Sequence, residues 1–416
     1  MRILVTGGRR LEGQVKISGA KNAALPILAA TILSNDSITL RNIPVLRDVD
    51  TMLSVLNTLG IKVKKERNGE IYIDPSNLKY FEAPYELVKS MRASILVMGA
   101  LLSKLKKARV ALPGGCAIGP RPIDLHLEGL KRFGAKIDLE KGYIEAETHG
   151  LKGCYIHLEY PSVGATENLM MAATLAEGET IIDGAAKEPE IVDLACFLNK
   201  MGARISGHGT DRIRIEGVKE LRGTIYKIIP DRIEAGTYVI AAAITKGDVT
   251  VSEMNPSHLW AVTTKLREAG VWIEEGESEV RARVLEKLRP VDVKTLPYPG
   301  FPTDMQAQFM ALMAITPGRS IITETVFKNR FMHVDELNRM GAVIKKDGNF
   351  ALIDGVESLS GAEVCATDLR ASACLILAGL AAKGDTFVSG ICHLDRGYER
   401  MEKKLAQIGA KIERIE

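Results

Sequence analysis

One stretch of the sequence, from Leu112 to Asp124, combines a thiol with residues that prevent regular secondary structure. It reads Leu-Pro-Gly-Gly-Cys-Ala-Ile-Gly-Pro-Arg-Pro-Ile-Asp, with three glycines and three prolines around Cys116 and Arg121. Glycine tolerates backbone angles that other residues resist, and proline fixes φ and lacks a donor, so the stretch is predicted to be a loop. A loop thiol beside a guanidinium can ionise or donate a proton, which makes Cys116 a candidate reagent. The alternative is a surface turn with an incidental packing cysteine.

The overall composition is that of a globular protein with a small net charge. The chain has 416 residues, of which 46% are hydrophobic and 26% charged, and its formal charge is +3. This length predicts two or three domains, and the charge is too small to predict nucleic-acid binding. No apolar run approaches the roughly 18 residues of a membrane helix, and the first residues lack the apolar core of a signal peptide. We therefore expect a cytoplasmic protein without membrane contact.

The six cysteines are scattered along the chain without any Cys-x-x-Cys spacing. This argues against a structural zinc site and a disulfide scaffold, so we expect reduced thiols and no metal or cofactor. His126 and His333 each lie at the start of a predicted amphipathic helix, where capping or packing accounts for them without a metal. The N-terminal Val-Thr-Gly-Gly superficially suggests a dinucleotide-binding turn, but an alternating strand follows it instead of a helix, which excludes that interpretation.

A short phrase recurs six times along the chain. An amphipathic helix runs into a glycine, and a short alternating strand follows, as in Leu130-Lys-Arg-Phe-Gly-Ala-Lys-Ile. The period of roughly 70 residues suits a small α/β module better than a solenoid repeat. Glycine at this position is typical of the end of a helix. The glycines are Gly60, Gly134, Gly202, Gly270, Gly341 and Gly409.

A second phrase alternates with the first and consists of a helix that is apolar nearly all round. Helices without a polar face belong in an interior, so each repeat is predicted to contain one buried and one surface helix. A turn and a strand follow each buried helix, which gives six βαβαββ units. The last unit stops one strand short at Glu416, and the spare strands at the N-terminus can complete it. The buried helices are predicted at residues 23–33, 93–102, 169–175, 238–244, 309–315 and 374–382.

These units predict an α/β fold of two similar domains. Each domain contains three repeated βαβαββ units, with buried helices sheathed by outer sheets. The first domain is predicted to span residues 21–229 and to carry the Cys116 loop. The second is predicted to combine residues 1–20 with residues 230–416.

Alignment of the six units on the start of the buried helix gathers polar residues at equivalent positions. Helix N-termini expose unpaired N–H groups and carry partial positive charge, so lysine and arginine there disfavour the helix unless an anion is bound. A ligand with phosphate or carboxylate is therefore predicted. The alternative is that the aspartates are plain helix caps and the basic side chains are solvated. The residues concerned are Lys21, Asn22, Arg92, Ser162, Asp304, Asp368 and Arg370.

The loops before the surface helices contribute further arginines: Arg47, Arg121, Arg330 and Arg396. If both kinds of loop lie at one end of each domain, the two domains can face one another across a cleft. Such a cleft would suit a small polyanion. It would be lined by Lys21, Arg92, Arg121, Arg330, Arg370 and Arg396.

Longer motifs are distributed from the first repeat to the last. They are Ser18-Gly-Ala-Lys-Asn-Ala-Ala-Leu-Pro-Ile, Met91-Arg-Ala-Ser, Leu112-Pro-Gly-Gly-Cys-Ala-Ile-Gly-Pro-Arg-Pro-Ile-Asp-Leu-His, Phe301-Pro-Thr-Asp-Met-Gln-Ala-Gln, Asn329-Arg-Phe-Met-His-Val, Ala366-Thr-Asp-Leu-Arg-Ala-Ser and His393-Leu-Asp-Arg-Gly-Tyr-Glu-Arg. Together they resemble the UDP-N-acetylglucosamine 1-carboxyvinyltransferases, a family of enolpyruvyl transferases. The resemblance implies two inside-out α/β domains. It also implies transfer of the enolpyruvyl group of phosphoenolpyruvate to the 3'-hydroxyl of UDP-N-acetylglucosamine with release of phosphate, the first committed step of peptidoglycan synthesis.

The resemblance also implies roles for individual residues. Cys116 resembles the general acid, which can form an adduct with phosphoenolpyruvate and react with fosfomycin, and Asp304 resembles the group that accepts the hydroxyl proton. Lys21 and Arg396 are implied in catalysis as well, and Asp368 is a further polar member of the site. Phosphoenolpyruvate is implied to contact Lys21, Asn22, Arg121, Arg370 and Arg396. The implied contacts of UDP-N-acetylglucosamine are Asn22, Arg92, Arg121, Pro122, Ile123, Asp124, Leu125, Ser162, Val163, Gly164, Asp304, Val326 and Arg330.

The sequence departs from some relatives at Tyr160-Pro161, where they have Lys-Val, so one side-chain cation is absent there. Two alternatives stay open. The first is 5-enolpyruvylshikimate-3-phosphate synthase, which resembles this fold and uses the same donor but lacks the Pro-Gly-Gly-Cys loop. The second is a non-catalytic binder or sensor of UDP-sugars, which has no need of a thiol or a base.

Overall fold

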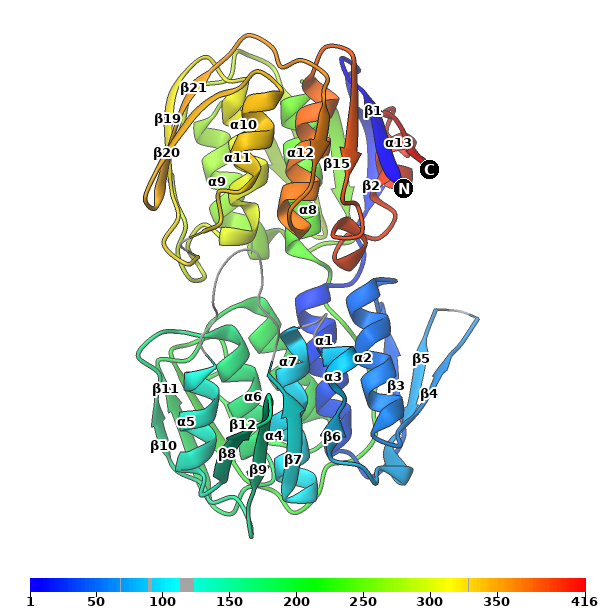
Figure 1. Cartoon of the computed structure of the whole chain (residues 1–416), viewed down its shortest axis with the longest axis vertical. Helices are drawn as coiled ribbons and strands as arrows, with labels where there is room; N and C mark the ends of the chain where they lie inside the picture. The colour runs from blue at the N-terminus through cyan, green and yellow to red at the C-terminus, as the bar shows by residue number, and fades with distance from the viewer. Residues whose placement is uncertain (68, 89–91, 113–122, 328) are drawn as a thin grey trace. The chain divides into compact units, whose positions relative to one another are not determined.

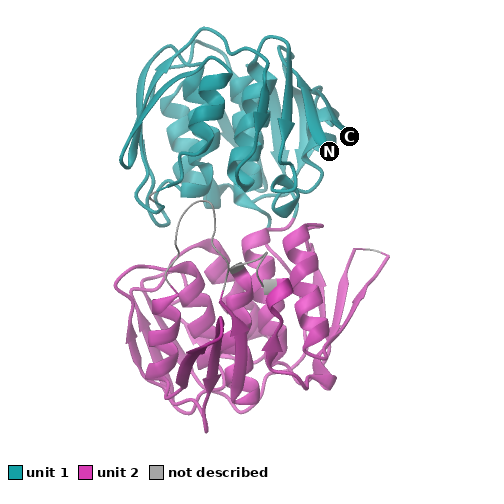
Figure 2. Cartoon of the chain, viewed as in Figure 1, with its two compact units in different colours: residues 1–18, 116–119, 230–416 teal, residues 19–115, 120–229 magenta. Residues whose placement is uncertain are grey.

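The computed structural model of the chain describes residues 1–67, 69–88, 92–112, 123–327 and 329–416. Within these residues the strands form six sheets of four strands each. The chain divides into two compact units (Figure 2). Unit 1 comprises residues 1–18 and 230–416, and unit 2 comprises the described residues of 19–229. That these units are the two domains predicted from the sequence stays a proposal.

Unit 2 contains three modules in sequence. The first is β2 (Glu12–Lys16), α1 (Lys21–Ala30), β3 (Ile38–Arg41), α2 (Arg47–Thr58), β4 (Lys62–Lys65) and β5 (Ile71–Asp74), with β2 itself in unit 1. The second is β6 (Glu82–Ala83), α4 (Val97–Leu105), β7 (Lys107–Ala111), α5 (Asp124–Arg132), β8 (Lys136–Glu140) and β9 (Tyr143–Glu147). The third is β10 (Tyr155–His157), α6 (Val163–Ala173), β11 (Glu179–Asp183), α7 (Pro189–Lys200), β12 (Arg204–Ser206) and β13 (Arg212–Glu216).

Unit 1 repeats the same order. Its first module is β14 (Ile225–Lys227), α8 (Arg232–Ile244), β15 (Asp248–Ser252), α9 (Trp260–Glu268), β16 (Val271–Glu275) and β17 (Glu279–Val284), with β14 itself in unit 2. The next is β18 (Val293–Lys294), α10 (Gln306–Ala314), β19 (Gly318–Thr323), α11 (His333–Arg339), β20 (Val343–Asp347) and β21 (Phe350–Gly355). The last is β22 (Glu363–Cys365), α12 (Leu369–Ala381), β23 (Asp385–Ser389), α13 (Met401–Gln407) and β24 (Lys411–Ile415).

Short elements supplement the modules in the described part of the chain. The extra α-helix is α3 (Tyr85–Val88). The 3-10 turns are η1 (Thr31–Leu33), η2 (Pro75–Asn77), η3 (Arg92–Leu96), η4 (Pro256–Leu259), η5 (Thr303–Met305) and η6 (Leu394–Arg396). Three of these turns, η3, η5 and η6, begin or contain predicted site residues.

Each unit is built inside out, as the sequence predicts. Helices α8, α10 and α12 pack against one another in the middle of unit 1, with the sheets outside them (Figure 1). Helices α1, α4 and α6 do the same in unit 2. Every residue of α8 is buried, and each large apolar side chain buried in this way stabilises the unit by about 1.5–3 kcal/mol. The apolar composition of these helices thus fixes their position at the centre.

The N-terminal strand completes the last sheet. Strand β1 (Arg2–Thr6) lies between β23 and β24 and pairs antiparallel with both. Its alternate residues Ile3 and Val5 face the core and are fully buried. The prediction that an N-terminal strand supplies the one missing after Glu416 is confirmed.

The two strands next to the unit boundary are exchanged. Strand β2 pairs parallel with β15 in unit 1, while β14 pairs parallel with β3 in unit 2. Where the chain crosses between units, the Asp231 N–H donates to the Ser18 carbonyl at 2.9 Å, and the Ala20 N–H donates to the Ile229 carbonyl at 2.7 Å. These two hydrogen bonds pair residues 18–20 with residues 229–231, directly before α1 and α8 begin.

The helix-ending glycines behave as predicted. All six have positive φ, from +91° at Gly134 to +106° at Gly202, which a side chain would oppose. They terminate the surface helices α2, α5, α7, α9, α11 and α13. Within the described residues, no helix combines the length and apolarity that crossing a bilayer requires.

Candidate functional site

The predicted site residues fall into two groups, one in each unit. Unit 1 holds Asp304, Val326, Arg330, Asp368, Arg370 and Arg396, and unit 2 holds Lys21, Asn22, Ile123, Asp124, Leu125, Ser162, Val163 and Gly164. Arg92 begins η3 in unit 2. Cys116, Arg121 and Pro122 lie outside the described residues. A common cleft between the two groups stays a prediction.

In unit 1, the Asp304 carboxylate is shared by two arginines. The Nη2 atom of Arg330 lies 2.7 Å from Oδ1, and the Nη2 atom of Arg370 lies 2.7 Å from Oδ2. Burial by itself would raise the pKa of this carboxyl, but the guanidinium groups of Arg370 and Arg330 outweigh it and hold the pKa well below its usual range. The carboxylate is therefore ionised at neutral pH. Its side chain is still 24% exposed, which leaves it accessible to a ligand.

The two arginines are more deeply buried than the carboxylate between them. Their side chains are 7% exposed at Arg330 and 4% at Arg370. Arg330 Nη1 also donates to Thr303 Oγ1 at 2.9 Å, and the Arg370 guanidinium lies 5.5 Å from the centre of the Tyr398 ring. Two guanidinium groups thus meet at one carboxylate in a place of low solvent access, and Asp231 is a further acid that acts on Arg370. Such a group of charges suits an anionic ligand.

Glu324 organises the backbone around this group of charges, and sequence reasoning missed it. Its side chain is buried and accepts hydrogen bonds from the Thr303 hydroxyl at 2.8 Å and from the Val326 N–H at 2.8 Å. It also accepts one from the Thr295 hydroxyl at 2.8 Å. Glu324 thus fixes both the residue before Asp304 and the predicted ligand contact Val326. One signal in the sequence could have indicated this residue. Glu324 directly follows strand β19, and neither of its neighbours in the sequence is basic.

The two predicted aspartates at helix starts in unit 1, Asp304 and Asp368, differ in their bonding. Asp368 is the N-cap of α12, and its Oδ1 accepts the N–H groups of Arg370 at 2.8 Å and Ala371 at 3.0 Å. The plain-cap alternative therefore describes what Asp368 does in this structure. Asp304 makes no such cap and instead pairs with Arg330 and Arg370, as described above. Arg396 lies at the end of η6 with a half-buried side chain.

In unit 2, Lys21 is the first residue of α1 and pairs with an acid of the neighbouring helix. Its Nζ lies 2.6 Å from Asp48 Oδ2, and the two side chains are only 11% and 6% exposed. Helix α1 has no side-chain cap and no acid in its first turn, so Asp48 of α2 balances the charge of Lys21. In this loop Arg47 was predicted from the sequence, and the neighbouring acid Asp48 was not.

The start of α6 also behaves as predicted from the alignment. Ser162 is the N-cap, and its hydroxyl accepts the Ala165 N–H at 3.3 Å. Val163 and Gly164 follow in the first turn and are partly exposed. Ile123 precedes α5 and Asp124 is its exposed first residue. His126, also on α5, is buried, and burial lowers its pKa to about 4.

Buried carboxyls lie further along α6 and α7. Burial and then the nearby acids Glu190 and Glu188 raise the pKa of Glu167 well above its usual value. Burial is also the main reason that the pKa of Asp193 is raised to about 6. Within the described residues, no group of three or more His, Cys, Asp or Glu side chains is arranged to hold a metal.

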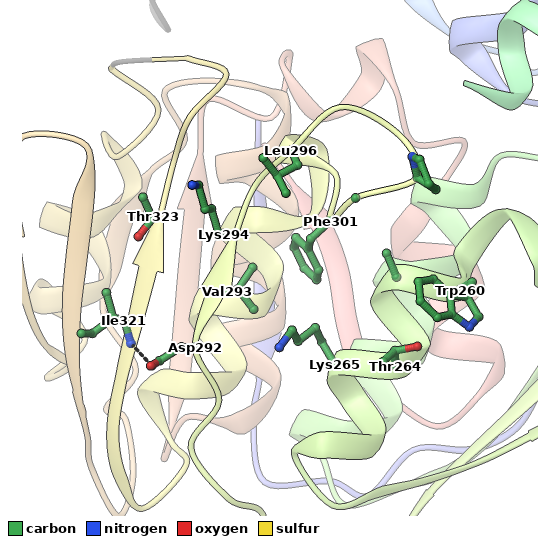
Figure 3. A pocket seen from close by; sticks show the side chains of 13 residues that line it. Trp260, Thr264, Lys265, Asp292, Val293, Lys294, Leu296, Phe301, Ile321 and Thr323 are labelled. Atoms are coloured by element: carbon green, nitrogen blue, oxygen red, sulfur yellow. Dashed lines mark hydrogen bonds between the residues drawn. The ribbon is translucent and has the colours of Figure 1, made fainter. Parts of the chain in front are cut away.

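A pocket of about 500 Å³ lies elsewhere in unit 1, between α9 and the edge strand β18 (Figure 3). Trp260 and Lys265 line it from α9, and Lys294 and Phe301 line it from the opposite side. None of its lining residues is among those predicted to bind a substrate. The predicted residues at the helix starts of unit 1 are therefore not part of the lining of this pocket.

Comparison with known proteins identifies the family. The family described as EPSP synthase (3-phosphoshikimate 1-carboxyvinyltransferase) matches residues 5–405. UDP-N-acetylglucosamine 1-carboxyvinyltransferase 2 of Carboxydothermus hydrogenoformans is 58% identical over 416 residues, which cover 100% of this chain and 99% of the relative. The UDP-N-acetylglucosamine 1-carboxyvinyltransferase of Geotalea uraniireducens is 57% identical over the same length and shares of each chain.

Solved structures confirm the predicted fold. The enolpyruvyl transferase NikO from Streptomyces tendae has a TM-score of 0.90 at 26% identity, covering 99% of this chain and 98% of its own. An EPSP synthase from Acinetobacter baumannii has a TM-score of 0.76 at 18% identity over the whole of both chains, which shows the same fold. Sequence and fold agree that this chain belongs to the UDP-N-acetylglucosamine 1-carboxyvinyltransferase family of enolpyruvyl transferases.

Proposed function

We propose that this chain transfers the enolpyruvyl group of phosphoenolpyruvate to the 3'-hydroxyl of UDP-N-acetylglucosamine and releases phosphate. The observation that carries this proposal is the 57–58% identity, over essentially the whole chain, with relatives that bear this activity in their names. The reaction needs two small-molecule substrates and no cofactor. Its product would enter peptidoglycan synthesis.

In the proposed reaction, the 3' oxygen attacks C2 of phosphoenolpyruvate while C3 takes up a proton, which gives a tetrahedral intermediate. Loss of a proton from C3 and of phosphate from C2 then restores the double bond. The donor brings a phosphate and a carboxylate close together, so fixed cations must neutralise both. The two arginines beside Asp304 in unit 1 and Lys21 at the start of α1 in unit 2 support this assignment.

The bonding of Asp304 suggests how it accepts the hydroxyl proton. A carboxylate bonded to two guanidinium groups is a weak base, because both interactions favour the charged form. Binding of an anionic donor to Arg370 would draw that guanidinium away from Asp304 and raise the carboxylate's pKa. We propose that the donor in this way increases the basicity of Asp304 before the sugar hydroxyl is deprotonated.

The proposed acid is Cys116, whose position lies outside the described residues. Cys116→Ser is expected to reduce turnover severely and to abolish inactivation by the epoxide fosfomycin, because the thiol supplies the proton and the nucleophile. Cys196→Ser is the matched control, because Cys196 is an exposed thiol on the surface helix α7 and is not among the predicted site residues. Full sensitivity of Cys116→Ser to fosfomycin would show that another cysteine is the target.

Phosphate release with each of two acceptors tests the proposed function. The purified chain with phosphoenolpyruvate should release phosphate when UDP-N-acetylglucosamine is added and not when 3-phosphoshikimate is added. The second acceptor is the necessary comparison, because the matching family description covers 3-phosphoshikimate 1-carboxyvinyltransferases. Release with 3-phosphoshikimate alone would replace the proposed acceptor. Release with neither would favour a non-catalytic binder.

A further inference from the structure

We propose that Asn168 is a positioning residue that fixes His126 in a single tautomer, with the ring proton on Nε2 beside the start of α6. Both residues belong to unit 2, and neither is among the residues that the family resemblance assigns to the site. The part of the inference that concerns UDP-sugar binding rests on the proposed function. The part that concerns the tautomer rests on the geometry alone.

The orientation of the Asn168 amide is set by two backbone groups. Asn168 is fully buried in α6, and its Oδ1 accepts the Gly99 N–H at 2.7 Å. Its Nδ2 lies 3.3 Å from the carbonyl oxygen of Ile95. A backbone N–H can only donate and a carbonyl can only accept, so these contacts distinguish the oxygen end of the amide from the nitrogen end.

The amide in turn determines where His126 carries its proton. His126 Nδ1 lies 3.0 Å from Asn168 Nδ2, which is the donor end of the amide. Nδ1 must therefore be an acceptor without a proton, and a neutral imidazole then carries its proton on Nε2. Burial keeps the ring neutral, since it lowers the pKa of His126 to about 4. Gly99, Asn168 and His126 thus form one chain of hydrogen bonds from α4 through α6 to α5.

The Nε2 edge of the ring faces the first turn of α6. A β-carbon at Gly164 would lie 3.3 Å from His126 Cε1 and 3.4 Å from Nε2, closer than most such contacts. The absence of a side chain at Gly164 therefore lets the ring approach this turn. Ser162, Val163 and Gly164 are the proposed contacts of the UDP-sugar, so the Nε2–H adds a donor where an anionic part of that substrate is expected. A ring protonated on Nδ1 would present a lone pair there instead.

Asn168→Asp tests this chain because it keeps the shape of the side chain but replaces the Nδ2 donor, which faces both His126 Nδ1 and the Ile95 carbonyl, with an oxygen. The ionised carboxylate still accepts the Gly99 N–H, and the oxygen that it presents to Nδ1 requires a proton on that nitrogen. Nitrogen-15 NMR of histidine-labelled protein at neutral pH should show a neutral ring protonated on Nε2 in the parent. It should show a ring protonated on Nδ1 in the variant, the signal being assigned by its absence in His126→Gln. The KM for UDP-N-acetylglucosamine should rise about tenfold in Asn168→Asp, with a smaller change in kcat.

Two substitutions of the histidine keep the proposal testable if Asn168→Asp does not fold. His126→Gln retains an N–H group near the position of Nε2, whereas His126→Asn is too short to reach it. We expect the KM for the sugar nucleotide to rise less in His126→Gln than in His126→Asn, and equal losses would overturn the donor role. A parent ring protonated on Nδ1 would overturn the tautomer assignment. This spectrum is recorded without substrate, so a failure of the tautomer is distinguishable from a failure of the proposed function.

Discussion

The two units repeat one module, but they use the starts of their buried helices differently. In unit 1, η5 and the start of α12 bring Asp304 between two arginines, so two cations share one carboxylate. In unit 2, the start of α1 places Lys21 against one acid, Asp48, and the charges balance. The fold thus repeats the positions at which helices begin, whereas the side chains at those positions determine what each start can bind.

This difference predicts where substitutions act. Removing the central carboxylate of unit 1 takes away the proposed proton acceptor, so turnover should suffer most. Removing the acid of the balanced pair in unit 2 leaves a buried cation without its partner, so stability should suffer most.

The largest expected effect is that of Asp304→Asn. The amide keeps the shape but cannot accept a proton, so we expect kcat to fall by about 10²- to 10⁴-fold. Steady-state phosphate release measures this change, with a thermal melt to confirm folding. Asp354→Asn is the matched control, because Asp354 pairs with Arg319 on the exposed face of unit 1. A kcat of Asp304→Asn close to that of the control would exclude Asp304 as the proton acceptor.

The next effect concerns stability in unit 2. Asp48→Asn should lower the free energy of unfolding by about 3 kcal/mol, because Lys21 remains buried without its counter-ion. Asp50→Asn on the same helix breaks the exposed pair with Lys65 and should cost less than about 1 kcal/mol. Urea denaturation of the two variants gives the comparison. Equal losses would mean that burial of the Lys21–Asp48 pair adds nothing to stability.

The third effect is a pH dependence of stability that differs in sign between the units. Burial raises the pKa of Glu234 in unit 1 from 4.5 to about 7, although Lys404 and the Ser18 N–H act in the opposite direction. The folded chain then holds a proton that the unfolded chain releases, so the stability that Glu234 contributes is lost as pH rises from 4.5 to 7. Burial lowers the pKa of His126 in unit 2 from 6.5 to about 4, so its contribution is lost as pH falls through this range.

Melting temperatures of Glu234→Gln and His126→Gln, each compared with the parent at about pH 5 and about pH 7, measure these opposite slopes. The Glu234→Gln variant should gain stability relative to the parent as pH rises. The His126→Gln variant should lose stability relative to the parent over the same interval. Slopes of the same sign would contradict the assignment of these two groups.

The sequence predicts the modules well because the signals are local. Apolar helices, helix-ending glycines and the missing last strand are all visible within one repeat, and the structure confirms them. Partners from other modules are not visible in this way. Asp304 and Asp368 both follow a threonine at a helix start, yet one pairs with two arginines and the other is a cap, because Arg330 and Arg370 converge on only one of them.

The residues that sequence reasoning missed share the same cause. Asp48 and Glu324 are significant only because the fold brings Lys21 to the first and Thr303 to the second. The interpretation of His126 as a packing residue agrees with its burial. That interpretation did not include the hydrogen bond between His126 and Asn168, because the two residues are far apart in the sequence.

A crystal structure of the chain with UDP-N-acetylglucosamine and an unreactive analogue of phosphoenolpyruvate would test the central claim most directly, namely that the starts of the buried helices bind the substrates. We predict that the anionic groups of the analogue contact Lys21 and Arg370, and that the sugar nucleotide lies at the first turn of α6 near Gly164. Substrates bound instead in the pocket between α9 and β18, with the Asp304 and Lys21 ion pairs unchanged and uncontacted, would contradict the account.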